Sequence, residues 1–137
     1  MRTSIAPVCF AAILTMTHAA EADPQNEEPR IILFGASWCA PCRVELRNLP
    51  ALAKAAAPNR LEVAWIDRAP PVSARTAGSN VVVLSPQEAL RKFEAIAGTN
   101  QGLPIIAMID GNRRLCAVLR QPATVARLQN LGASCPE

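Results

Sequence analysis

The stretch from Arg30 to Arg43 reads Arg-Ile-Ile-Leu-Phe-Gly-Ala-Ser-Trp-Cys-Ala-Pro-Cys-Arg, and it decides the fold. Its four consecutive apolar residues, 31–34, predict a strand that is buried on both faces, as in a sheet with helices on either side. After the second cysteine, apolar residues recur at three- and four-residue steps, which predicts an amphipathic helix. Cys39 and Cys42 therefore come where a buried strand gives way to the first turn of a helix.

A helix start favours an anion, because its first N–H groups are unpaired and the positive end of the macrodipole lies there. A thiolate is such an anion, and Cys-x-x-Cys at this place lowers a thiol pKa from about 8.5 toward 7. Pro41, which follows Ala40, is tolerated in the first turn because its missing donor would have no partner. We expect a redox-active disulfide in which Cys39 faces solvent as the nucleophile and Cys42 points inward as the resolving thiol.

Two other interpretations of the Cys-x-x-Cys pair compete with this one. A zinc knuckle needs a second ligand pair at suitable spacing, and none follows in the sequence. A purely structural bridge would not need the strand–turn–helix context. The redox interpretation accounts for both the motif and its surroundings.

Ser37-Trp-Cys-Ala-Pro-Cys-Arg43 after an apolar strand resembles the active site of the thioredoxin-like family. It is most similar to the secreted bacterial thiol-disulfide reductases associated with cytochrome c maturation (TlpA/ResA/DsbE-like). The resemblance implies an α/β thioredoxin-like fold, with a central mixed sheet flanked by helices on both faces, over residues 30–137. It also implies a cis proline at Pro104, where Leu103 would offer its backbone to a substrate strand. Trp38 would shield one side of the site, or else be a plain core aromatic.

The sequence departs from thioredoxins proper at two positions. Motif spacing places Leu33 and Val63 where those proteins carry a buried aspartate and its lysine partner. Neither residue ionises. Glu45 is the nearest acidic residue, but we expect it on the solvated side of the helix, which would leave proton transfer to water.

Composition sets further limits on function. The 137 residues suit one domain, and 50% hydrophobic with 18% charged residues exclude a disordered chain. The net charge of +3 comes without a basic run, so nucleic acid is not an expected partner. The single histidine, His18, lies in the N-terminal segment, which removes histidine-based catalysis and metal sites from a processed protein.

Residues 1–22 have the features of a secretory signal: Arg2, an apolar run of about twelve residues, then small residues. Cleavage after Ala19, Ala20 or Ala22 would leave residues 23–29 as a solvated leader and export the domain to the periplasm. An uncleaved anchor is the alternative, but the run is short of the roughly 20 residues that span a bilayer.

The rest of the chain alternates strand and helix patterns. Pro50 predicts a kink in a first helix that runs to about residue 57. Ser85, Pro86 and Glu88 predict the start of another helix, which Gly98 ends. The remaining expectations are strands at 61–66, 81–84, 105–109 and 114–119, a loop at 69–80, a hairpin turn at 110–112, and a last helix opened by 121–122 with Val125, Leu128 and Leu131 inward.

Five cysteines less Cys9 of the signal leave an even number for an oxidising compartment. Cys116 and Cys135 could form a structural disulfide or stay as two independent thiols. Both arrangements remain open at this point.

The sequence supports three functional hypotheses. The first is a periplasmic protein-disulfide oxidoreductase, working as a monomer in the reductase direction, without an organic cofactor or a metal. Its partners would be protein thiols and disulfides and a membrane electron donor. The second is a secreted copper chaperone that uses Cys39 and Cys42 as soft ligands. The third, an idle structural subunit, is disfavoured by the intact Trp-Cys-Ala-Pro-Cys.

Overall fold

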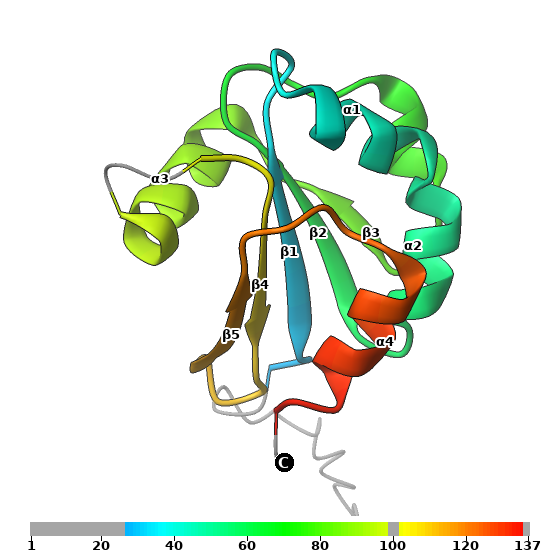
Figure 1. Ribbon diagram of the computed structural model, residues 1–137, viewed down its shortest axis with the longest axis vertical. Coiled ribbons are helices and arrows are strands. Elements are labelled where there is room, and N and C mark those ends of the chain that lie inside the picture. Colours follow the sequence, from blue (N-terminus) through cyan, green and yellow to red (C-terminus); the bar gives the residue numbers. More distant parts are fainter. Residues whose placement is uncertain (1–26, 99–101, 136–137) are drawn as a thin grey trace, which may run out of the picture.

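The computed structural model of the chain describes residues 27–98 and 102–135 (Figure 1). Its elements, in chain order, are β1 (Arg30–Gly35), α1 (Ala40–Arg47), α2 (Leu49–Ala56), β2 (Arg60–Trp65), the 3₁₀ helix η1 (Val72–Thr76), β3 (Val81–Val83), α3 (Pro86–Ala97), β4 (Ile105–Ile109), β5 (Leu115–Leu119) and α4 (Val125–Gly132).

The strands form one mixed sheet in the order β3-β2-β1-β4-β5. Strands β1, β2 and β3 are parallel, whereas β4 runs antiparallel to both β1 and β5. In this register Phe34, near the end of β1, pairs with Ile105 at the start of β4. The turn after β1 and the residues before β4 therefore meet at one end of the sheet.

Both faces of the sheet are covered, as Figure 1 shows, with α3 on one face and α1, α2 and α4 on the other. Alternate residues of β1 serve the two sides, because successive side chains of a strand point to opposite faces. Ile31 and Leu33 pack under α2 and α4, and Ile32 and Phe34 pack under α3. The expected α/β architecture, with a mixed sheet between helices, is confirmed.

The first helix differs from the expected single kinked helix. The chain forms two helices that meet at Asn48, whose N–H donates to the carbonyls of Val44 and Glu45. Asn48 then accepts from the next helix through Ala51 N–H. Pro50 has no N–H to continue the first ladder, so α1 ends and α2 restarts with proline in its first turn.

Two other segments also differ from expectation. Residues 69–80 contain η1 in place of a continuous loop. The last helix begins at Val125, after the Thr124 side chain caps Arg127 N–H, and not at residues 121–122. Val125 is consequently 43% exposed, whereas Leu128 and Leu131 are buried as expected. The start of α3 matches the sequence, with Ser85 accepting from Glu88 N–H and Pro86 in the first turn.

The expected signal segment, residues 1–22, lies outside the described residues, as do most of the leader residues 23–29. Across residues 27–98 and 102–135, no helix has the length and apolar character needed to cross a membrane.

Candidate active site

Cys39 and Cys42 form a disulfide at the start of α1, with their Cα atoms 5.3 Å apart. Cys39 is the N-cap residue of the helix, and its Sγ accepts a hydrogen bond from Cys42 N–H at 3.3 Å. Pro41 lies in the first turn, where its missing N–H leaves no gap in the ladder. The first sulfur is thus held at the positive end of the helix, beside a backbone donor that would stabilise a thiolate.

The expectation that Cys39 faces solvent is not met in this disulfide form. Cys39 is 4% exposed and Cys42 0%. The reason is the cap geometry, which turns Cys39 Sγ back over the helix end toward Cys42 and into the core under α1. Cys39 is still the more accessible of the two cysteines, and its neighbours Ala40 and Pro41 are exposed.

Trp38 stands out from the surface directly before the disulfide, with 68% of its area exposed. It does not belong to the buried core. The alternative of a plain core aromatic is therefore wrong, because a core side chain would be buried. The shielding role of Trp38 stays a prediction.

The Leu103–Pro104 peptide bond is cis. Pro104 is buried directly before β4, and β4 begins opposite Phe34. The bond therefore lies at the sheet end from which the chain enters the Cys-x-x-Cys turn. Leu103 is half-buried and packs against both core clusters. Its backbone contact with a substrate stays a prediction.

Glu45 is buried, which corrects the expectation of a solvated position. Its side chain is 4% exposed, and its Oε1 accepts a hydrogen bond from Ala123 N–H at 2.5 Å. Burial raises the pKa of Glu45 to about 6, although the hydrogen bond from Ala123 acts in the opposite direction. Three residues after Cys42 on one helix, Glu45 lies on the same helix face as the buried thiol.

That helix spacing was the signal in the sequence that could have found Glu45. Cys42 was expected to point inward, and a residue three positions later shares its face. The acid is covered by the segment between β5 and α4, which no local pattern identifies. Leu33 and Val63 are buried in the same core, so the positions that carry an ionisable pair in thioredoxins are apolar here.

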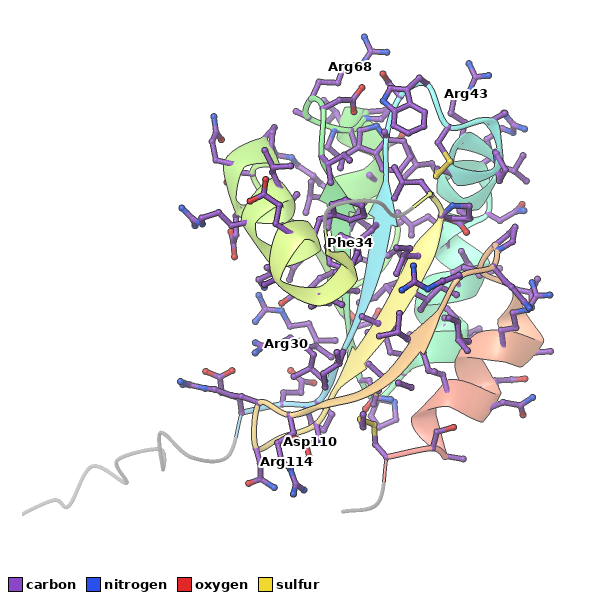
Figure 2. All side chains as sticks on the ribbon, turned by 60° about the vertical axis from the view of Figure 1, so that its left-hand side comes forward. Arg30, Phe34, Arg43, Arg68, Asp110 and Arg114 are labelled. Carbon is purple, nitrogen blue, oxygen red and sulfur yellow. A yellow bond between two sulfur atoms is a disulfide. The ribbon has the colours of Figure 1, made fainter. Side chains whose placement is uncertain are left out.

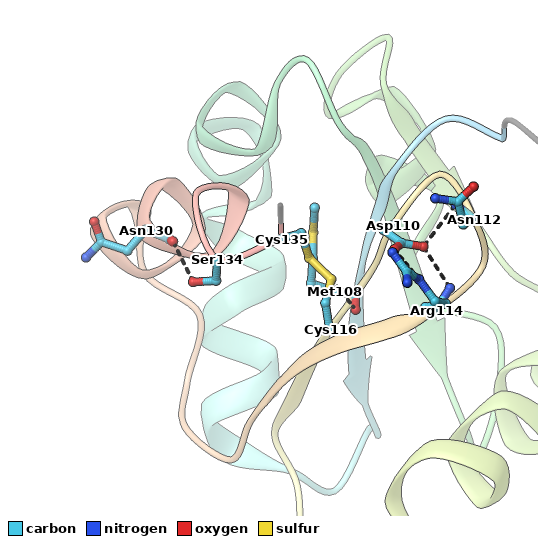
Figure 3. The surroundings of a disulfide bond; sticks show 8 residues. All are labelled: Met108, Asp110, Asn112, Arg114, Cys116, Asn130, Ser134 and Cys135. Atoms are coloured by element: carbon cyan, nitrogen blue, oxygen red, sulfur yellow. Dashed lines mark hydrogen bonds and ion pairs between the residues drawn. A yellow bond between two sulfur atoms is a disulfide. The ribbon is translucent and has the colours of Figure 1, made fainter. Parts of the chain in front are cut away.

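Among the described residues, the two other buried acids lie away from this core. Glu62 is on β2, where Lys92 of α3 pairs with it at 2.7 Å and Arg60 at 3.5 Å. Asp110 organises the β4–β5 turn by accepting hydrogen bonds from Asn112 and Arg114 (Figure 3). Glu45 is thus the buried carboxyl of the described chain that shares a helix with the disulfide.

The turn that carries the disulfide is tied to the neighbouring strand. Ser37 donates hydrogen bonds from its backbone N–H and its hydroxyl to the carboxylate of Asp67, which follows β2. Desolvation raises the pKa of Asp67, but the hydrogen bonds from Ser37, together with those from the backbone of Asp67 and Arg68, outweigh it, and the pKa is lowered. An ionised Asp67 therefore anchors the turn two residues before Cys39.

A second disulfide joins Cys116 of β5 to Cys135 beyond α4, with Cα atoms 5.7 Å apart (Figure 3). Of the two arrangements left open by the sequence, the structure contains the bridge. Cys116 lies near the start of β5, away from the sheet end that carries Cys39. The bond closes a loop that contains Ala123, the residue whose N–H binds Glu45.

Comparison with known proteins shows similarity in structure. No protein-family model and no curated protein sequence matches the chain. StoA from Bacillus subtilis superposes with a TM-score of 0.57 at 18% identity, over 80% of this chain and 85% of StoA. A secreted disulfide oxidoreductase from Mycobacterium tuberculosis, homologous to DsbE of E. coli, gives 0.51 at 14% identity, over 81% of this chain and 84% of that one.

Copper-bound ScoI from Bradyrhizobium japonicum is also similar, with a TM-score of 0.54 at 16% identity, over 81% of this chain and 87% of ScoI. At these identities the likeness concerns the fold, and the chain has a thioredoxin-like fold. Within residues 27–98 and 102–135, no group of three or more His, Cys, Asp or Glu side chains could hold a metal ion.

Proposed function

We propose, from a thioredoxin-like fold with a disulfide at the start of its first helix, that the protein is a thiol–disulfide oxidoreductase acting on protein disulfides. One observation carries the proposal: Cys39 caps α1, and its Sγ accepts a hydrogen bond from Cys42 N–H. This arrangement stabilises a thiolate at the first cysteine and keeps the second cysteine within bonding distance.

The reaction needs only the two cysteines and a disulfide in the partner. In the reduced protein, Cys39 thiolate attacks one sulfur of the partner's disulfide, which breaks and releases the other sulfur as a thiolate. Cys42 then loses its proton and attacks Cys39 Sγ in the mixed disulfide. The partner leaves as a dithiol after protonation, and the Cys39–Cys42 disulfide seen in the structure is regenerated.

Glu45 is the group that we assign to proton transfer at Cys42. Its carboxyl shares a helix face with Cys42 and is shielded from bulk solvent. With a pKa of about 6, Glu45 is mostly ionised near pH 7 and can accept the thiol proton. In this proposal Glu45, and not water, accepts the proton of Cys42.

We assign substrate contact to Trp38, Leu103 and Pro104. The two chain segments that carry them reach the same end of the sheet, because β1 and β4 pair antiparallel. Leu103 offers backbone groups beside a proline that has no N–H, so an extended substrate segment can pair there without a competing donor near the sulfurs.

We further propose that the protein is exported to the periplasm as a monomer and works as a reductase, with cytochrome c maturation as its setting. Ala40 and Pro41 place no charge between the cysteines, so the thiolate depends on backbone donors and the helix dipole. That modest stabilisation favours the disulfide form and makes the dithiol an electron donor. A membrane donor would then have to keep it reduced.

Insulin reduction with dithiothreitol tests the proposed function. The protein without its signal should accelerate precipitation of the insulin B chain, and Cys39→Ser should abolish the acceleration. The Cys116→Ser/Cys135→Ser variant is the matched control, since it removes the same chemistry at the other disulfide and should remain active. Equal rates with and without the protein would contradict the proposal.

Copper binding is the second candidate, and the likeness to copper-bound ScoI favours it. Cys39 and Cys42 could supply two soft ligands after reduction. Among the described residues, no His, Asp, Glu or further Cys completes a group of three ligands with them. Competition for Cu(I) against a chromophoric chelator separates the two candidate functions. A copper chaperone should retain Cu(I) as the reduced wild type and lose it as the Cys39→Ser variant.

A further inference from the structure

A groove of about 340 Å³ opens beside the disulfide, between α1 and the chain that follows β2. Leu46 and Trp65 contribute apolar surface to its lining, and Arg43 and Arg68 contribute charge. Ser37, also in the lining, lies two residues before Cys39. The groove therefore begins at the turn that carries the reactive sulfur.

The two arginines of this groove have no ionic partner among the described residues. At the opposite end of the sheet the cations are paired: Arg30 with Glu27 at 2.9 Å and Arg114 with Asp110 at 3.0 Å. Figure 2 shows this separation, with Arg43 and Arg68 extending at one end of the molecule and Arg30, Asp110 and Arg114 at the other. The redox end thus carries two guanidinium groups that make no ion pair with a described residue, next to the ionised Asp67.

Asp67 is close to the groove in sequence, and its carboxylate is already hydrogen-bonded. Asp67 precedes Arg68 in the sequence, but its carboxylate receives the hydrogen bonds of Ser37. Among the described residues that line the groove, none is acidic. A ligand in the groove would therefore meet two free guanidinium groups, which bind carboxylates with good geometry.

We propose that this groove binds an acidic segment of the protein partner, next to the disulfide that Cys39 attacks. Reduction of the disulfide next to this segment rests on the function proposed above, whereas binding of the segment in the groove does not. An extended chain advances about 3.3 Å per residue, so carboxylates a few positions from the partner's cysteine are the ones that can reach the groove. A nucleic acid is not the expected occupant, because the charge is confined to two arginines and forms no stripe.

A kinetic experiment compares two fluorogenic peptides that share one disulfide and differ in their flanks, acidic in one and lysine-rich in the other. The wild-type protein should reduce the acidic peptide faster, by roughly two- to thirtyfold for two exposed charge pairs at low salt. The preference should vanish in Arg43→Gln/Arg68→Gln. It should persist in Lys54→Gln/Arg91→Gln, which removes the same charge from exposed positions on α2 and α3.

A binding experiment keeps the groove testable apart from the chemistry. The acidic peptide with serine in place of cysteine is titrated while the indole N–H signals of Trp65 and Trp38 are followed by NMR. Trp65 lines the groove, so its signal should shift with the wild type and stay fixed with Arg43→Gln/Arg68→Gln. Equal rates of reduction for both peptides, or a Trp65 shift that persists in the double variant, would contradict the proposal that the groove binds an acidic segment. Failure to reduce either peptide would instead count against the redox function.

Discussion

Glu45 and Ala123 are joined by a hydrogen bond in which the Ala123 N–H donates to Glu45 Oε1. The contact connects the redox helix α1 to the segment between β5 and α4, and it covers a carboxyl that shares its helix face with Cys42. The Cys116–Cys135 disulfide closes the loop in which Ala123 lies. The reactive end of the molecule therefore includes the first helix and the segment that leads from β5 into α4.

Glu45→Gln should change how stability depends on pH. Burial raises the pKa of Glu45 to about 6, so the folded state disfavours the ionised form, and the contribution of this group is fully present below pH 4.5 and lost as pH rises through about 6. Glutamine keeps an acceptor for Ala123 N–H but cannot ionise. The free energy of unfolding of the variant should exceed that of the wild type near pH 7 by up to about 2 kcal/mol and equal it near pH 4, as measured by chemical denaturation.

The same variant should lose activity while it gains stability. Without the proton acceptor on the helix face of Cys42, disulfide reduction near pH 7 should fall tenfold or more, and its rise between pH 5 and 7 should flatten. Glu94→Gln, an exposed acid on α3, is the matched control. A stability gain of equal size at both pH values would contradict the raised pKa of Glu45, and an unchanged pH–rate profile would contradict its role in proton transfer.

Loss of the second disulfide should cost stability more than activity. Cys116 and Cys135 lie 19 positions apart in the sequence, and chain-entropy reasoning gives about 3 kcal/mol for a loop of this length. The Cys116→Ser/Cys135→Ser variant should unfold at a lower denaturant concentration, with a free energy of unfolding that is about 3 kcal/mol smaller. Mass spectrometry of the oxidised, denatured wild-type protein should find no alkylatable thiol at Cys39, Cys42, Cys116 or Cys135. Two alkylated sites at residues 116 and 135 would mean that the bridge does not form in solution.

Gly35→Ala should destabilise the fold strongly. A Cβ at Gly35 would overlap the ring of Trp65, which is buried on the adjacent strand β2. Relief of that overlap requires backbone or ring movement, at a cost of about 1–3 kcal/mol in the free energy of unfolding. Gly102→Ala is the control, since a Cβ there meets no atom within 4 Å. Thermal or denaturant unfolding should separate the two variants, and equal stabilities would refute the packing argument.

The reduction potential should lie at roughly −200 to −270 mV, between glutaredoxin-like and thioredoxin-like values. The physical reason is that Cys39 relies on the Cys42 N–H and the helix dipole, with no charged residue at positions 40 and 41. Equilibration with glutathione buffers, followed by the fluorescence of exposed Trp38, measures the value. A potential near −120 mV would make the protein an oxidant and reverse the proposed direction.

Much of the fold could be predicted from sequence because its signals are local. The apolar run 31–34, the Ser85–Pro86 helix start and the turn at 110–112 each describe an element without reference to the rest of the chain. The Cys-x-x-Cys motif likewise depends on one strand–helix junction.

The errors share a different origin. Glu45 is buried because a segment distant in sequence covers it, through Ala123. Val125 is exposed because Thr124 caps the last helix and makes Val125 its first residue. Cys39 is covered because its sulfur turns back into the core. Each outcome depends on tertiary packing, which residue periodicity does not report.

The most direct test of the redox site is to trap its covalent intermediate. The Cys42→Ser variant, incubated with a disulfide-bonded model protein, should accumulate a mixed disulfide that peptide mapping assigns to Cys39 and that dithiothreitol releases. Cys39→Ser should form none under the same conditions. Absence of an adduct with Cys42→Ser, or an adduct that maps to Cys116 or Cys135, would contradict the assignment of Cys39 as the nucleophile.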